Sequence, residues 1–388
     1  MKHHSAQQPG TGSTAADKTA PHEVDTDLVA AAAGARRVPG LDFPLSRRTD
    51  PVSVRPGVRV VVRRVTGRLA ESGRPEVSDV IGTLLSVDPL VVRPAPRKRE
   101  PGTTAQEPVE IAAGSVVVLK TLSTKPVRNS DIRAVEEAIA QAFPGIENSW
   151  VEGWLCRAGD GITERSNTAV PLGPNAALQP VPVEGIKAFY AQHELPAALM
   201  VPDRIGRTAE NLEGTRGPEI LVMTRELEDL GEPPALTGDA GLVHPNFAGQ
   251  TLEIEVLDQP TEEWLSRYHF RGQPLPEHAL ELLRTRIDGT LGFAQVRIGG
   301  TLAAITRATI TTTEAGRSFL GYSAVEVLPE YRRHGLATHL GHVLLHWGAQ
   351  HGATEAYLEV IETNTAGRGL YHDLGFSEHH RHRSLQLD

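Results

Sequence analysis

The chain is predicted to be a mixed α/β protein with a small all-β region near its N-terminus. Short β-branched runs separated by Gly, Pro and Asp dominate residues 51–123. From residue 126 onward, strand-like runs alternate with stretches whose apolar residues have helical spacing. The 388 residues, with 39% hydrophobic and 22% charged content, suffice for two or three ordinary globular domains.

The first 123 residues divide at about residue 50. Residues 1–50 are rich in Ala, Thr, Pro and Gly, which predicts a disordered tail with one short helix at 27–36. Residues 51–123 predict an SH3-like β-barrel with a loop at 96–108. Such a barrel could dock a peptide or nucleic acid, or be a structural appendage. Its strands are expected at 58–63, 80–85, 90–93 and 111–119.

The middle region, residues 126–235, predicts a further α/β domain. Ile132, Val135, Ile139 and Ala142 have the spacing of one helix face over 131–142. Two strand-like segments follow across the turn A-G-D-G. The remaining elements are a helix at 183–193 and strands at 198–201 and 220–225.

A linker is predicted at 236–250, before a C-terminal domain at 251–388. Gly299 and Gly300 indicate a hairpin turn between two strands. The predicted strands are 252–257, 292–298, 301–310, 319–328 and 356–362, and the predicted helices are 261–268, 276–287 and 366–374, with one more opening near residue 336.

The segment V-E-V-L-P-E-Y-R-R-H-G-L-A, residues 325–337, is suited to holding a pyrophosphate. Gly335 lets the backbone approach a ligand closely, and the helix that opens there presents unpaired N–H groups. Two arginines add positive charge. The expected contacts are Arg332, Arg333, His334, Gly335, Leu336, Ala337 and Thr338. Alone, this short motif also fits an ordinary strand-turn-helix with solvated arginines.

A second motif follows at the right separation: N-x-x-x-x-x-L-Y-x-x-L-G-F, residues 364–376. Together the two motifs resemble the GNAT family of N-acetyltransferases, with Gly367 standing where the family usually has Ala. The resemblance covers residues 250–388 and implies a GNAT fold with a mixed sheet. Residues 126–235 lack an R-x-x-G-x-A turn and are expected to be a degenerate GNAT-like half.

The resemblance implies acetyl-CoA as the acetyl donor, no metal, and direct transfer to an amine. The backbone N–H of Val327 would face the acetyl carbonyl. Tyr371 would donate a proton to the departing thiolate. Asn364 would contact the pantetheine arm or cap the last helix. The alternative for Tyr371 is a buried core aromatic.

The general base is open between Glu326 and Glu359, which lie on adjacent predicted strands. Strand alternation lets one of them face the cleft, and a base acting through water is the alternative. The only cysteine, Cys156, lies in a strand-like segment and is expected to be a packed small side chain, not a nucleophile.

The layout from residue 51 resembles actinobacterial proteins, some of which are described as N-acetylglutamate synthases of arginine biosynthesis. This implies L-glutamate as the acceptor, whose two carboxylates need cations. The candidates are Arg267, Arg271, Arg307, Arg157 and Arg165. The alternatives are an acetyltransferase for protein lysines or another small amine, and a non-catalytic acetyl-CoA-binding regulator.

Composition is typical of a cytoplasmic globular protein. The net charge of −9 argues against a nucleic-acid partner. No apolar run is long enough to cross a membrane, and one cysteine allows no internal disulfide. His339, His342 and His346 are expected to be a solvated stripe, and the run H-H-R-H-R at 379–383 an exposed strand end or tail.

Overall fold

The computed structural model describes residues 26–47, 49–70, 72–95, 106–122, 127–270, 273–285 and 287–388. The chain forms two compact units, residues 1–121 and 122–388. Among the described residues there is no helix whose length and apolar character would allow it to span a membrane.

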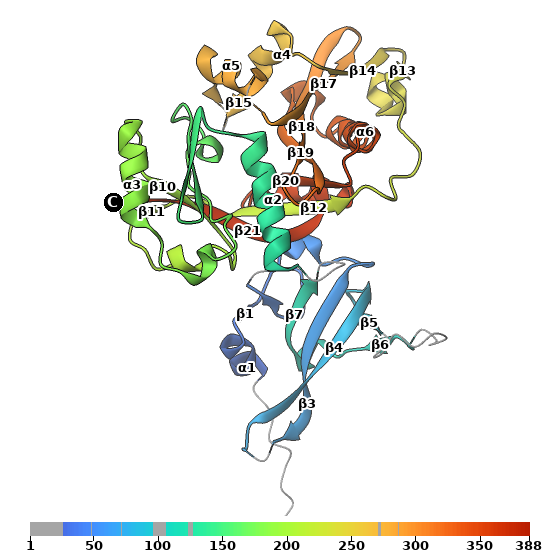
Figure 1. The fold of residues 1–388 in the computed structure, drawn as a ribbon. Coiled ribbons are helices and arrows are strands. Elements are labelled where there is room, and N and C mark those ends of the chain that lie inside the picture. Colours follow the sequence, from blue (N-terminus) through green and yellow to red (C-terminus); the bar gives the residue numbers. More distant parts are fainter. Residues whose placement is uncertain are drawn as a thin grey trace, which may run out of the picture. The chain divides into compact units, whose positions relative to one another are not determined.

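The first unit is a seven-stranded sheet with the strand order β1-β2-β7-β3-β4-β5-β6 (Figure 1). Phe43, Leu45, Val60, Leu84 and Leu119 lie in its buried core. The all-β character agrees with the prediction. The strand order has two ends, β1 and β6, so closure of the sheet into an SH3-like barrel stays a prediction. The elements are α1 (Thr26–Ala32), β1 (Ala35–Arg36), β2 (Leu45–Ser46), β3 (Arg59–Leu69), β4 (Pro75–Ser86), β5 (Val91–Pro94), β6 (Val109–Glu110) and β7 (Val116–Leu122).

The second unit alternates helices and strands, as predicted. Its first half contains α2 (Asn129–Ala142), β8 (Glu147–Val151), β9 (Trp154–Ala158), α3 (Val183–Gln192), β10 (Ala198–Pro202), β11 (Thr215–Arg216), β12 (Ile220–Glu226) and β13 (Thr237–Asp239). Its second half contains β14 (Thr251–Leu257), α4 (Glu262–Arg267), β15 (His269–Phe270), β16 (Gln273–Pro274), α5 (Glu277–Thr285), β17 (Gly289–Ile298), β18 (Thr301–Thr312), β19 (Ser318–Val327), α6 (Leu336–Gln350), β20 (Glu355–Ile361), α7 (Thr365–Asp373) and β21 (Ser377–Gln386).

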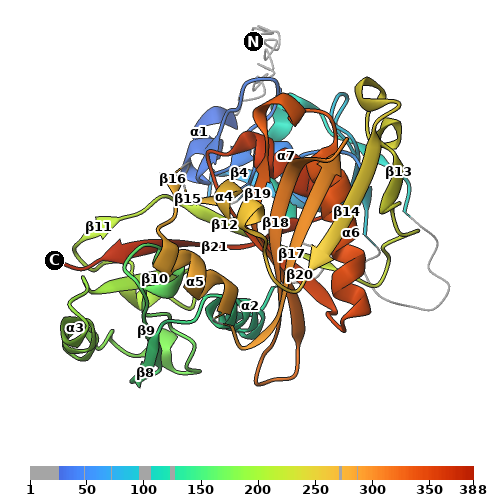
Figure 2. The same ribbon diagram turned by 90° about the horizontal axis from the view of Figure 1, so that it is seen from above.

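One ten-stranded sheet runs through this unit in the order β10-β21-β12-β20-β19-β18-β17-β14-β13, with β11 beside β21 (Figure 2). The pair β19–β20 is parallel. The pairs on either side of it, β12–β20 and β18–β19, are antiparallel. The sheet is therefore mixed, as expected, and its parallel pair lies near the centre.

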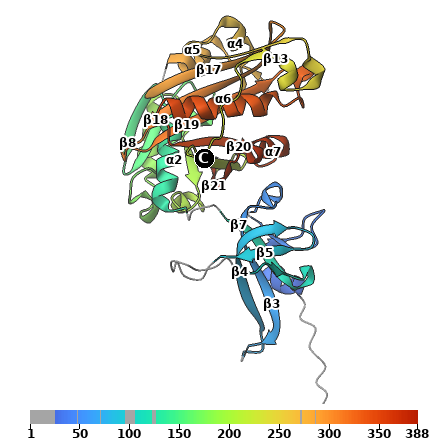
Figure 3. The same cartoon turned by 90° about the vertical axis from the view of Figure 1, so that its right-hand side faces the viewer.

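Helices cover both faces of this sheet. Helix α6 lies along the sheet (Figure 3). Its Leu336, Leu340 and Leu344 share a buried cluster with Tyr322 and Leu358 of the sheet. On the other face, apolar residues of α2 pack against Phe319 of β19 and Tyr357 of β20. The two faces are called the α6 face and the α2 face below. Burial of each helix's apolar stripe stabilises this layered arrangement.

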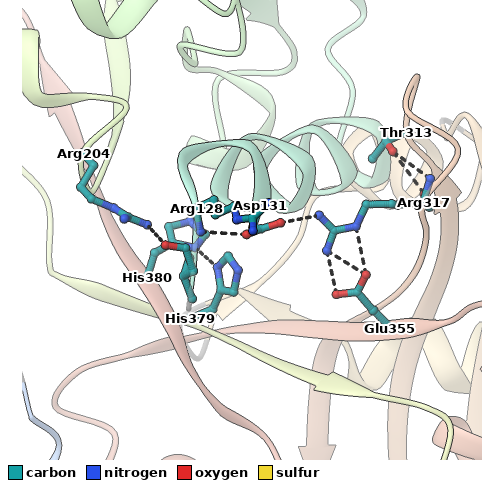
Figure 4. A network of polar contacts seen from close by, with 9 residues as sticks. Arg128, Asp131, Arg204, Thr313, Arg317, Glu355, His379 and His380 are labelled. Carbon is teal, nitrogen blue, oxygen red and sulfur yellow. Dashed lines mark hydrogen bonds and ion pairs between the residues drawn. The ribbon is translucent and has the colours of Figure 1, made fainter. Parts of the chain in front are cut away.

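A polar network also fixes α2 to the sheet (Figure 4). The Asp131 carboxylate accepts a hydrogen bond from the Arg128 N–H at 2.7 Å and one from the Arg317 guanidinium at 3.2 Å. Arg317 in turn donates to both oxygens of Glu355 on β20. Because the Arg317–Glu355 contact is bidentate, its geometry is well defined.

Long-range strand pairing departs from the predicted organisation in two places. Residues 126–235 and 251–388 were expected on either side of a linker, yet β12 lies between β20 and β21, and both regions share one compact unit. The run H-H-R-H-R was predicted to be exposed, which is wrong. It lies in β21, where His380, Arg381 and His382 are buried, because β21 pairs with β10 and β12 on its two sides.

The predicted tail is also shorter than 50 residues. Residues 1–25 lie outside the described residues. From Thr26 the chain forms α1, which agrees with the short predicted helix. Phe43 and Leu45 are then fully buried in the first unit, because their apolar side chains complete its core.

Candidate functional site

The parallel strands β19 and β20 separate part-way along their length. They pair from Phe319 with Glu355 up to Tyr322 with Leu358. Beyond that point β19 follows β18, where Val327 pairs with Ala304, whereas β20 follows β12. A gap therefore opens between the last residues of β19 and those of β20.

A β-bulge in β19 explains the separation. The β18–β19 register shifts between Ile305 and Arg307, and Ala324 has a left-handed φ of 57°. The Thr306 hydroxyl bridges the irregularity by donating to the Ser323 carbonyl at 2.9 Å. Because a bulge bends its strand and increases the local twist, β19 diverges from β20 immediately after it.

Backbone groups on both sides of the gap point into it. The Leu328 N–H donates to the Ala303 carbonyl on the β18 side. Because the N–H groups of consecutive strand residues point to opposite edges of the strand, the Val327 N–H points away from β18 and toward the gap. On the other side, the Glu362 N–H donates to Glu219, toward the β12 side. By the same alternation, the backbone groups of Glu359 and Ile361 face the gap.

The turn after β19 has the geometry of an anion site. A short 3₁₀ helix, Pro329–Tyr331, precedes two left-handed residues, Arg333 with a φ of 65° and Gly335 with a φ of 81°. The first α-helical bond of α6 runs from the His339 N–H to the Gly335 carbonyl. The N–H groups of the three residues in between are therefore available to a ligand. Glycine suits position 335 because of its φ: an added Cβ would lie 3.6 Å from its nearest neighbour, an ordinary contact.

The predicted pyrophosphate contacts surround this turn. Arg332 and Arg333 are exposed, and His334, Ala337 and Thr338 are half-buried. Leu336 is buried and packs into the core of the α6 face, so its backbone is the part that a ligand can reach. The Arg332 Nε donates to the Val327 carbonyl at 2.8 Å, which holds this side chain close to the end of β19.

A cavity of about 360 Å³ lies beside the end of β19. Arg267, His269, Glu326 and Arg332 supply its ionisable lining. Burial raises the pKa of the Glu326 carboxyl above its usual value, although His269 and Arg332 act in the opposite direction. The Arg267 Nε is buried and has no hydrogen-bond partner among the described residues. A carboxyl with a raised pKa and a cation with a spare donor therefore share one small cavity.

Tyr371 lies on the other side of the sheet. Its ring packs with Val327 against the core of the α6 face and lies 6.2 Å from the Phe376 ring. Burial raises the pKa of the Tyr371 hydroxyl to about 12, so it stays protonated at neutral pH. Glu326 precedes Val327 in the strand and therefore points to the opposite, α2 face.

Asn364 is occupied by a local role. Its side chain caps α7 by accepting a hydrogen bond from the Gly367 N–H at 2.9 Å. A Cβ on residue 367 would approach the Asn364 amide nitrogen to 2.7 Å. Glycine at position 367, where the family pattern has Ala, therefore leaves space for the capping side chain. Of the two roles expected for Asn364, the geometry shows helix capping.

The second predicted base, Glu359, lies in a different environment from Glu326. Its carboxylate is 3.2 Å from His382 Nε2 and 3.6 Å from the Arg165 guanidinium. Burial acts to raise its pKa, but the His382 hydrogen bond and the Arg165 charge hold that pKa below the usual value. An ionised, doubly engaged carboxylate is a poor general base, so the structure separates the two glutamates.

The arginines predicted for the acceptor lie in different environments. Arg267 lines the cavity, whereas Arg271 lies outside the described residues. Arg157 is fully buried and donates to the Thr168 and Phe143 carbonyls and the Thr168 hydroxyl. Arg307 is also buried, donates to the Ala142 carbonyl, and has its pKa lowered to about 10 by burial. Arg165 contacts Glu359, so a residue from the middle region does reach β20.

Three residues of the site escaped sequence reasoning. His269 lines the cavity, and nothing in its short strand distinguished it. Glu136 and His382 form a buried pair at 2.7 Å. Helical spacing could have revealed Glu136, which falls on the apolar face of α2 between Ile132 and Ile139.

The two remaining side-chain predictions concern Cys156 and the α6 histidines. Cys156 is buried, and burial raises the pKa of its thiol to about 12, which agrees with a packing role. His339, His342 and His346 are half-buried, not fully solvated. The His339 Nε2 lies 2.9 Å from the Ala235 carbonyl, so one of these histidines contacts the segment before β13.

Comparisons with known proteins identify the family. A family model described as "Probable histone acetyltransferase Rv0428c C-terminal" matches residues 129–385. The "Probable histone acetyltransferase Rv0428c" of Mycobacterium tuberculosis is 36% identical over 330 residues, which cover 85% of this chain and 94% of that protein. An "Uncharacterized N-acetyltransferase YobR" of Bacillus subtilis is 22% identical over 258 residues, covering 64% of this chain and 97% of that protein.

Among solved structures, a GCN5-related N-acetyltransferase from Kribbella flavida is 16% identical, with a TM-score of 0.44, and covers 67% of this chain and 96% of its own. The family model spans more than half of the chain, and the mycobacterial relative matches most of its length. The chain therefore belongs to the family of the Rv0428c C-terminal region and is a GNAT-type N-acetyltransferase.

Proposed function

We propose that this N-acetyltransferase transfers an acetyl group from acetyl-CoA directly to a small amine that carries a carboxylate, with L-glutamate as the first acceptor to test. The observation that carries the proposal is the gap between β19 and β20. The Val327 N–H points into it, Glu326 lies on the α2 face beside it, and Tyr371 packs on the α6 face. The proposal assigns the roles of acid, base and hydrogen-bond donor around this opening to Tyr371, Glu326 and Val327.

The turn from Arg332 to Thr338 would hold the pyrophosphate of the donor. The left-handed residues Arg333 and Gly335, followed by the free N–H groups of α6, form a concave set of backbone donors. The side chains of Arg332 and Arg333 add positive charge at its edge. GNAT enzymes use acetyl-CoA, whose thioester supplies the activated acetyl group.

Three groups of this chain then serve the transfer. Glu326 accepts a proton from the acceptor ammonium, since only a neutral amine can attack the acetyl carbon. The Val327 N–H stabilises the negative charge that develops on the carbonyl oxygen. Tyr371 donates its hydroxyl proton to the departing sulfur. The raised pKa of Glu326 suits a base, because a more basic carboxylate removes a proton more readily.

The cavity supports an acceptor that carries its own carboxylate. Arg267 places a guanidinium in the same space as Glu326, and its Nε has no hydrogen-bond partner in the described part of the chain. A carboxylate next to the reacting amine would satisfy that donor. Acetylated glutamate would place the enzyme in arginine biosynthesis, and the lone, buried Cys156 suits the reducing cytoplasm in which that chemistry occurs.

The second candidate acceptor is a lysine side chain of a protein. The name of the mycobacterial relative, a probable histone acetyltransferase, favours it. A lysine has no carboxylate beside its reacting amine and would leave Arg267 without a partner. In this alternative, the first unit would act as an SH3-like docking module for the protein substrate.

Thiol release from acetyl-CoA separates the two candidates. The full chain would be assayed with L-glutamate, the other amino acids and lysine-containing peptides at matched concentrations. Turnover that is highest with glutamate and falls when Arg267 is replaced by Gln supports the proposal. Turnover with peptides alone would reject the glutamate assignment and leave the lysine alternative.

A further inference from the structure

A chain of charged side chains runs from α2 to the gap between β19 and β20. The Glu136 carboxylate on α2 lies 2.7 Å from His382 Nδ1 on β21. The other nitrogen of His382 lies 3.2 Å from the Glu359 carboxylate on β20. Glu359 lies 3.6 Å from the guanidinium of Arg165. Arg165 belongs to the short 3₁₀ helix Glu164–Ser166, so the series links four elements: α2, this 3₁₀ helix, β20 and β21.

Exposure increases along this chain of charges. The Glu136 and His382 side chains are 2% and 0% exposed, Glu359 is 10% exposed, and Arg165 is 18% exposed. A molecule in solvent can therefore reach the series at Arg165. Desolvating charges is costly even when they are paired, so a buried ion-pair series is weak evidence for added stability. The buried series is better explained as holding Arg165, its most exposed member, in position.

The cluster carries more positive than negative charge. Despite burial, His382 and His380 hold the pKa of Glu136 below its usual value, and His382 and Arg165 do the same for Glu359, so both carboxylates are ionised. Although burial opposes it, the two carboxylates raise the pKa of His382 to about 10. Arg157, which donates to neutral oxygens, lies close enough for both carboxylates to affect its pKa. These five residues comprise three cations and two anions, and such an excess favours an anionic ligand.

The guanidinium of Arg165 is oriented but not saturated. It lies over the Phe143 ring, 4.0 Å from its centroid, and its 3.6 Å contact with Glu359 is longer than a hydrogen bond. Within the described ranges it donates no hydrogen bond. Stacking fixes the plane of the group and leaves its fork of donors for an anion such as a carboxylate, which this fork can bind through two hydrogen bonds.

Arg165 lies on the acceptor side of the sheet. Its partner Glu359 directly follows Leu358, the last β20 residue paired with β19. Glu359 shares the α2 face with Tyr357, two residues earlier in the strand. Glu326 points to the same face from the opposite side of the gap. Phe143, over which Arg165 lies, shares a buried cluster with Leu302 and Ile305, which line the cavity of Glu326 and Arg267.

We propose that Arg165, held by Phe143 and by the Glu136–His382–Glu359 series, binds a second carboxylate of the acceptor and makes the enzyme selective for a dicarboxylic amino acid. This inference rests on the proposed transfer to an amine near Glu326. Arg267 would take the carboxylate next to the amine, and Arg165 the carboxylate at the other end of the molecule. Glu136 and His382 are positioning residues, since they act through Glu359.

The test compares L-glutamate with L-glutamine, which differ in one charged group. For wild type and for Arg165→Gln, Arg165→Lys and Arg133→Gln, the KM of each amino acid and of acetyl-CoA would be measured. Wild type should prefer glutamate. Arg165→Gln should raise the KM for glutamate about 10- to 100-fold more than that for glutamine, the range for one charged hydrogen-bonded contact. Arg165→Lys, which keeps the charge without the fork, should fall in between, and Arg133→Gln should match wild type.

Each other outcome rejects a definite statement. If Arg165→Gln raises the KM for glutamate and the KM for glutamine equally, or if wild type does not favour glutamate, Arg165 does not bind the second carboxylate. If wild type acetylates neither amino acid, the proposed acceptor class fails and this inference fails with it. An unchanged KM for acetyl-CoA in the same preparations shows that the donor site is folded, so a collapsed variant cannot imitate the expected result.

Discussion

Replacing Glu326 by Gln tests the assignment of the general base most directly. The substitution keeps the size of the side chain and removes its ability to accept a proton. The described structure shows no hydrogen bond or ion pair from Glu326, so the free energy of unfolding should change by no more than about 0.5 kcal/mol. A loss of activity would then report chemistry and not folding.

The size of the expected loss follows from the cavity. General base catalysis contributes about 10²–10⁴-fold. We expect the lower part of that range, about 10²–10³-fold in kcat, because the His269 imidazole lines the same cavity and offers a second proton acceptor. In the wild type, kcat/KM should rise with pH as Glu326 loses its proton, and burial moves this rise above the usual range of a carboxyl. The variant should lack it.

The assay is thiol release from acetyl-CoA across a pH series, with thermal unfolding measured on the same samples. Glu330→Gln is the matched control, since Glu330 is an exposed carboxylate of the same turn and does not line the cavity. Wild-type kcat and an unchanged pH profile in Glu326→Gln would refute its role as base. A similar loss in Glu330→Gln would show instead that net charge at the turn matters.

Three further outcomes are expected. Tyr371→Phe should lower kcat about 10²-fold at unchanged KM, because the ring packing remains while the proton donor is lost. Steady-state kinetics equal to those of wild type would show that Tyr371 has no catalytic role. Gly335→Ala should cost about 1–2 kcal/mol of stability at its φ of 81° and raise the KM for acetyl-CoA, and a variant with both values unchanged would contradict the turn geometry. Glu136→Gln should destabilise the fold by about 3–5 kcal/mol in urea denaturation, because it leaves the buried, protonated His382 without its main counter-ion. A change below about 1 kcal/mol would show that the Glu136–His382 pair does not contribute to stability.

Local sequence signals predicted the secondary structure around the candidate site well. The Gly-containing turn after β19 and the Asn-to-Phe motif around α7 depend on neighbouring residues, because backbone φ, helix caps and helix starts are set within a few positions. The family, the acetyl donor and the class of reaction followed from these motifs. The hairpin at Gly299 and Gly300 and the helix at α2 were predictable for the same reason.

Choosing between similar side chains required the tertiary structure. Glu326 and Glu359 look alike in the sequence, yet one lies in a cavity and the other contacts His382 and Arg165. The two differ in pKa because burial and neighbouring charges depend on which distant elements pack together. Arg307 and Arg157 were equally plausible acceptor contacts, and burial assigned them to the core.

The sequence by itself determined the geometry of the β19–α6 turn, since that turn is made by consecutive residues. Only the tertiary structure decided that the run His380 to His382 is an interior strand and that residues 126–235 share a sheet with the C-terminal region. The physical reason is that strand order and charge burial arise from contacts between residues more than a hundred positions apart, such as Glu136 and His382, and no local pattern encodes such partners.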